Sequence, residues 1–88
     1  MNLPFTEKKI SQNVFIRNFS SEIDSGELYW HRDGEDRLVE SVYETDWMIQ
    51  LDNQLPIKIE GEIFIPKGVY HRLIKGSNDL QIRLTKLF

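Results

Sequence analysis

Short apolar runs separated by turn residues are the feature that most constrains the fold of this chain. The runs are rich in Val, Ile, Tyr, Trp and Phe, which pleated strands favour, as at 47–52, 62–67 and 80–88. A helix needs an apolar stripe of 3.6-residue period over about ten residues or more. Only 20–28 hints at one, and Gly26 limits it to a single turn. The spacing of the runs, roughly 8 to 12 residues, predicts roughly seven or eight antiparallel strands in an all-β sandwich or barrel.

Length and composition narrow the class of protein. The 88 residues accommodate one domain, 1–88, in which 1–12 forms an N-terminal arm or an edge strand. A net charge of −3 argues against a surface that binds nucleic acid. No apolar run reaches the roughly 20 residues of a membrane span, and 1–10 lacks the apolar stretch of a signal peptide, so we expect a cytoplasmic protein without membrane contacts. Because the chain has no cysteine, metal ligands must be His and carboxylate.

A Gly-Glu pair at 34–35 lies between two strand-like runs, 27–33 and 37–44, and predicts a hairpin with a type II′ tip. Residues paired across a hairpin share a face, and alternate residues along each strand swap faces. Counting outward from the tip places one imidazole, one phenol and three carboxylates on the same face: His31, Tyr29, Asp33, Asp36 and Glu40. A loop of three residues would instead turn Glu40 outward.

The other face of the predicted hairpin carries Trp30, Val39 and Tyr43. These side chains either pack beneath the N-terminal segment or contact a second copy of the chain. A barrel of 88 residues has little material to cover both faces of its sheets, and aromatic residues are enriched at protein interfaces. We therefore expect a homodimer.

The second histidine ends the run GEIFIPKGVYH, from Gly61 to His71. Its pattern P-x-G-x-x-H after a short apolar strand resembles the second motif of the cupin superfamily. The first cupin motif, roughly G-x5-H-x-H-x(3–4)-E-x6-G, is matched loosely by Gly26 and by His31-Arg-Asp33. The spacing from Gly26 is one residue short, Asp33 replaces the second histidine, and Leu38 falls near the place of the glutamate.

This resemblance implies a small antiparallel barrel, the double-stranded β-helix or jelly roll of the cupins, with a metal bound inside. His31 and His71 correspond to family ligands, and Asp33 stands at a ligand position with a different residue type. Glu40, one step beyond Leu38 on the same predicted face, is the replacement that we infer from geometry for the missing glutamate.

Two histidines and a carboxylate have the composition of the triad that holds Fe(II) in non-haem oxygenases. Such a mixed set suits divalent Fe, Mn, Ni or Zn and leaves positions for a small polar molecule. If the protein is an enzyme, two chemistries fit these ligands: that of an Fe(II)-dependent dioxygenase, or that of a sugar isomerase or epimerase. In the second case Glu40 would shuttle protons and Tyr29 would position the substrate.

The competing interpretation is a metal-free cupin that serves as a small-ligand-binding or assembly module. The departures in the first motif are what loss of a metal would leave behind. His31 and His71 would then be half-buried histidines hydrogen-bonded in the core, and Asp33 a turn residue beside Gly34.

Overall fold

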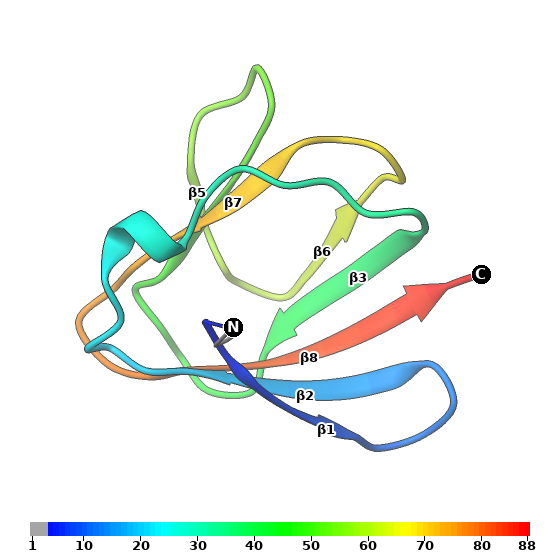
Figure 1. Ribbon diagram of the computed structural model, residues 1–88, viewed down its shortest axis with the longest axis horizontal. Coiled ribbons are helices and arrows are strands. Elements are labelled where there is room, and N and C mark those ends of the chain that lie inside the picture. Colours follow the sequence, from blue (N-terminus) through cyan, green and yellow to red (C-terminus); the bar gives the residue numbers. More distant parts are fainter. Residues whose placement is uncertain (1–3) are drawn as a thin grey trace.

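The computed structural model describes residues 4–88, which form two antiparallel sheets around one apolar core (Figure 1). The larger sheet has five strands in the order β1 (Thr6–Lys9), β2 (Val14–Phe19), β8 (Leu80–Leu87), β3 (Asp36–Ser41) and β6 (Glu62–Ile65). The smaller sheet has three, in the order β5 (Ile57–Lys58), β4 (Met48–Leu51) and β7 (His71–Ile74). A short 3-10 helix, η1 (Ser25–Glu27), lies between β2 and β3. The predicted all-β antiparallel architecture is confirmed, and β1 is an edge strand.

The core lies between the sheets and is filled by alternate residues of their strands. On β8, Leu80, Ile82 and Leu84 are buried while Arg83 is exposed, as the alternation of the sequence predicts. Trp47, just before β4, has no exposed surface, and its indole Nε1–H donates a hydrogen bond to the carbonyl oxygen of Asn78. No helix within residues 4–88 is both long and apolar enough to cross a membrane.

The predicted hairpin around 34–35 is wrong. Helix η1 occupies the start of the first predicted strand, and His31 forms an isolated bridge with His71 instead of pairing within a local hairpin. Strand β3 pairs with β6 and β8. The pair at 34–35 therefore belongs to a crossover between the two sheets, which Figure 1 shows as the segment leading from η1 into β3.

Backbone hydrogen bonds explain this path. The carbonyl oxygen of Asp33 accepts from the amide of Gly68 at 3.0 Å, and the Asp36 carboxylate accepts from the amide of Lys67 at 2.7 Å. The segment 31–36 is thus held by the segment 67–71. Because its polar backbone groups find partners there, it has no need of a local hairpin.

The predicted inward orientation of Glu40 is also wrong. Along β3, Val39 is 3% exposed and faces the core, so Leu38 and Glu40 point to the opposite face of the sheet. The register sets Glu40 between Glu62 and Arg83. The burial of Val39 likewise removes it from the predicted dimer interface, whereas Trp30 and Tyr43 are exposed.

Candidate metal centre

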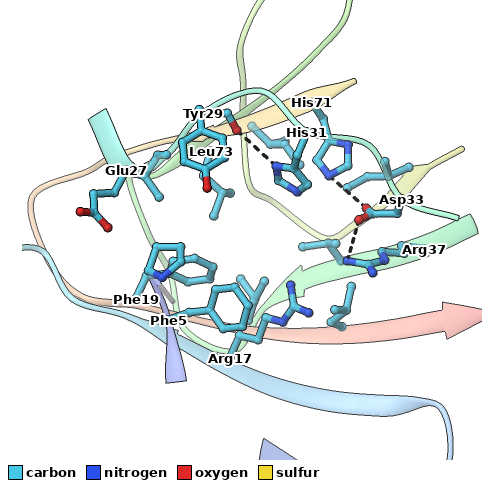
Figure 2. A pocket seen from close by; sticks show the side chains of 17 residues that line it. Phe5, Arg17, Phe19, Glu27, Tyr29, His31, Asp33, Arg37, His71 and Leu73 are labelled. Atoms are coloured by element: carbon cyan, nitrogen blue, oxygen red, sulfur yellow. Dashed lines mark hydrogen bonds and ion pairs between the residues drawn. The ribbon is translucent and has the colours of Figure 1, made fainter. Parts of the chain in front are cut away.

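Three of the four predicted metal ligands come together at one end of the barrel. Each of His31, Asp33 and His71 offers a ligand atom, and these atoms lie within 4.8 Å of one another. Figure 2 shows both imidazoles and the carboxylate on the same side of the cavity. Glu40 is not part of this cluster, because it points out of the opposite face of β3.

The backbone brings the two imidazoles together. The amide of His31 donates to the carbonyl oxygen of His71 at 3.0 Å, and the amide of His71 donates to the carbonyl oxygen of His31 at 2.8 Å. Residues that exchange both hydrogen bonds across an antiparallel ladder present their side chains on the same face. The ring centroids are consequently 4.2 Å apart, in an edge-to-face arrangement.

A backbone hydrogen bond at Nδ1 leaves Nε2 of each imidazole as the candidate ligand atom. Nδ1 of His31 lies 3.2 Å from the carbonyl oxygen of Tyr29, and Nδ1 of His71 lies 2.9 Å from that of Val69. Since a carbonyl oxygen only accepts, both Nδ1 atoms carry the proton and donate it. In the neutral form of each ring the lone pair is then on Nε2, and the carbonyl groups orient the rings as outer partners of metal ligands do.

Asp33 supplies the observation that tests whether a cation fits. Its side chain is 11% exposed, and Oδ1 lies 3.3 Å from Nη1 of Arg37. Its Oδ2 is buried without a hydrogen-bond partner among residues 4–88 and lies 3.3 Å from Nε2 of His71. A carboxylate oxygen and an imidazole lone pair that face each other repel unless a proton or a cation lies between them. A divalent ion in this position would satisfy both atoms.

The lowered pKa of His71 favours a cation, and not a proton, between its Nε2 and Oδ2 of Asp33. Burial lowers the pKa of His71 below its ordinary value of 6.5, and the neighbouring His31 and Arg37 lower it further. The hydrogen bond to Val69 and the charge of Asp33 act in the opposite direction without reversing the shift. His71 is thus a neutral imidazole near pH 7, the form that binds metals.

A cavity of about 330 Å³ adjoins the cluster. Its walls are largely apolar and come from both sheets and from the segment after η1: Leu28, Val39, Ile49, Leu73, Ile82 and Leu84. Tyr29, predicted to act on a substrate, lines this cavity and is 68% exposed. The arrangement offers a polar end with candidate metal ligands and an apolar body large enough for a small organic molecule.

Sequence reasoning missed two arginines that line the cavity, Arg17 and Arg37. The sequence does contain a signal for Arg17, because its spacing of two residues from Phe15 and from Phe19 places it on the apolar face of β2. Arg37 lies two residues from the buried Val39 on β3 and shares its face, which the predicted hairpin turns away from the two histidines.

Comparison with solved structures identifies the fold. A RmlC-like cupin with a double-stranded β-helix fold, from Methanocaldococcus jannaschii, matches with a TM-score of 0.64 over 97% of this chain and 81% of that one, at 16% identity. The chain has the cupin fold. A DMSP lyase matches with a TM-score of 0.72 at 16% identity over 85% of the chain, and Fe(II) HppE with 0.63 at 9% over 84%.

The chain spans 37% of the length of the lyase and 41% of that of HppE. No family model and no curated protein matches its sequence. The double-stranded β-helix implied by the P-x-G-x-x-H motif is nevertheless confirmed by the structural match. At 16% sequence identity the likeness is visible in the structure, whereas the comparisons of sequence find no match.

Proposed function

We propose that this cupin-fold protein binds one divalent metal ion through His31, Asp33 and His71 and holds a small molecule in the adjoining cavity. The observation that carries the proposal is the buried, unpartnered Oδ2 of Asp33 facing Nε2 of His71 at 3.3 Å. Two nitrogens and one oxygen suit Fe(II), Mn(II), Ni(II) or Zn(II). HppE, which shares the fold, is an Fe(II) protein, and this supports a metal role for the barrel.

The chain's own residues prepare the site in three ways. The Tyr29 and Val69 carbonyl groups orient the imidazoles, Arg37 holds one oxygen of Asp33, and the apolar walls limit water around the ligand. A bound metal would supply Lewis acidity or, as Fe(II), activation of oxygen. With three protein ligands, further positions stay open for water or for a donor atom of the bound molecule.

Of the two enzyme classes considered, the geometry favours an Fe(II)-dependent oxygenase over a sugar isomerase or epimerase. An isomerase needs a carboxylate or an equivalent base beside the substrate to move a proton. Glu40, the base predicted for that role, points away from the cavity. Among the described residues, two carboxylates line the cavity. Glu27 is exposed, and Asp33 would be engaged as a metal ligand, so neither is free to act as the base. The apolar walls also suit a substrate with an apolar part better than a hydroxyl-rich sugar.

A metal-free binding module is the second candidate, and one observation favours it. Arg37 contacts Asp33 at 3.3 Å and Glu35 at 2.9 Å, so Asp33 has a counter-charge without any metal. In this alternative the same cavity binds a small molecule, and the cluster of His31, Asp33 and His71 only shapes its polar end.

Metal content separates the two candidates. The protein would be purified without chelator, its bound metals measured by inductively coupled plasma mass spectrometry, and Zn²⁺ and Mn²⁺ titrated calorimetrically into the EDTA-treated form. We expect one equivalent per chain and a loss of affinity of at least roughly tenfold in Asp33→Asn, since changes to outer-shell groups alone cost that much. Asp52→Asn, at an exposed aspartate, is the matched control. A parent that takes up no metal would leave the metal-free module as the function, and equal uptake by Asp33→Asn and Asp52→Asn would show that Asp33 is not a ligand.

A further inference from the structure

An arginine projects from the apolar face of β2 into the cavity. Arg17 is two residues from Phe15 and two from Phe19 on β2. The three side chains therefore point to the same, inner face of the strand, where both rings contact the core. The side chain is 15% exposed. Figure 2 shows its guanidinium pointing into the cavity from below, toward the side that holds Asp33 and the two histidines. A cation in such surroundings requires a partner, because burying an unpaired charge is costly.

The partners of Arg17 within the chain occupy only part of its guanidinium. Glu7, directly opposite in β1, accepts a hydrogen bond from Nε at 2.5 Å, and the ring of Phe5 lies 4.1 Å below the central carbon. Nη1 and Nη2 have no acceptor in the described part of the chain, and neither is fully sealed from solvent. Two parallel donors are therefore available to a molecule in the cavity.

The second arginine of the cavity is different. Arg37 directs Nη1 to Asp33 at 3.3 Å and both Nε and Nη2 to Glu35, at 3.2 and 2.9 Å. All three of its nitrogens thus have a carboxylate partner within the protein. Arg17 is thus the cavity arginine with donors to spare, and apolar walls lie around it.

We propose that Arg17 anchors the carboxylate of a small organic acid whose apolar part fills the cavity. The inference rests on the proposed ligand-binding function of the cavity and names its ligand class. Two terminal nitrogens in one plane match the two oxygens of a carboxylate, the bidentate geometry for which arginine is suited. A phosphate would bring a second negative charge to a guanidinium that Glu7 already partly neutralises. Besides Asp33, the carboxylate residue that lines the cavity is Glu27, which is exposed and points away from Arg17 in Figure 2, so it leaves room for an acid at the guanidinium.

Hexanoate and its uncharged counterpart hexanamide test this anchor. Both would be titrated calorimetrically into the EDTA-treated protein and into the protein loaded with Zn²⁺. We expect the parent to prefer hexanoate over hexanamide by about tenfold or more in both forms, since a charge-assisted pair of hydrogen bonds has this effect. Arg17→Gln abolishes the preference, and Arg17→Lys, which keeps the charge and loses the fork, retains part of it. Arg83→Gln, at an exposed arginine of β8, binds like the parent.

Glu7→Gln provides an independent variant. Removing the carboxylate that competes for the guanidinium tightens hexanoate binding severalfold if Arg17 is the anchor. Equal binding of hexanoate and hexanamide by the parent, or an unchanged preference in a folded Arg17→Gln or Arg17→Lys, overturns the inference. An Arg17-dependent preference in a protein that takes up no metal would refute the proposed metal function alone, whereas metal uptake without the preference would refute the anchor alone.

Discussion

His31 and His71 exchange both of their backbone hydrogen bonds, at 3.0 and 2.8 Å, although they lie in different halves of the chain. This one bridge joins the crossover segment to β7 and places two imidazoles side by side. The candidate metal centre therefore depends on a closed barrel. In the unfolded chain the two histidines are far apart, so a metal bound by both must stabilise the folded state.

Metal binding is accordingly expected to raise the unfolding temperature. A ligand that binds only the folded state at a free concentration of 100 times its dissociation constant adds about 2.7 kcal/mol to the free energy of unfolding. Differential scanning calorimetry with Zn²⁺, and again after excess EDTA, measures the rise and its reversal. His71→Ala should melt at the same temperature with and without Zn²⁺, while Asp52→Asn should keep the full rise. A metal-induced rise that survives in His71→Ala would place the ion elsewhere.

The sequence predicts the fold and most of the site for a physical reason. Alternation along β8 decides which side chains are buried, and the histidines and Asp33 occupy motif positions of a fold that was correctly inferred. The prediction for Glu40 is wrong because it depends on a local hairpin, whereas long-range hydrogen bonds hold this backbone, as between Asp33 and Gly68. Pairing partners distant in sequence leave no local pattern, and a register that is wrong by one residue inverts every side chain.

The predicted homodimer now rests on fewer residues. Trp30 and Tyr43 are exposed, at 39% and 69%, while Val39 belongs to the core. Exposed aromatics are enriched at interfaces between proteins, so we expect the parent to sediment as a dimer and Trp30→Ser or Tyr43→Ser to shift it toward the monomer. Sedimentation equilibrium over a range of concentrations makes the measurement. A monomeric parent at all concentrations would refute the dimer.

Gly76 is expected to be the residue that leaves room for Trp47, so that a side chain at position 76 destabilises the fold. A Cβ atom at this position would contact the carboxylate of Asp46 and would lie 2.8 Å from the backbone nitrogen of Trp47. Trp47 has no exposed surface and cannot move aside, so Gly76→Ala should lower the free energy of unfolding by about 1–3 kcal/mol. Gly34→Ala is the matched control, since nothing lies within 4 Å of its added Cβ. Urea unfolding of both variants compares them, and equal midpoints would contradict the packing argument.

The lowered pKa of His71 predicts how the stability of the metal-free protein changes in acid. Burial lowers its pKa in the folded state, whereas the unfolded chain titrates near 6.5. Below 6.5 the unfolded chain takes up a proton that folded His71 resists, so the unfolded state binds more protons and stability falls. The contribution of neutral His71 to the free energy of unfolding is fully present above pH 6.5. It is lost as the pH falls from there through the lower pKa of the folded state.

Urea unfolding in EDTA between about pH 8 and pH 5 measures this loss. His71→Asn keeps a side-chain N–H for the Val69 carbonyl oxygen and removes the titrating group, so its free energy of unfolding should vary less over this range than that of the parent. Asp52→Asn controls for a change at an exposed site and should follow the parent. If His71→Asn loses as much stability in acid as the parent, protonation of another group causes the loss, and His71 is not held neutral by its burial.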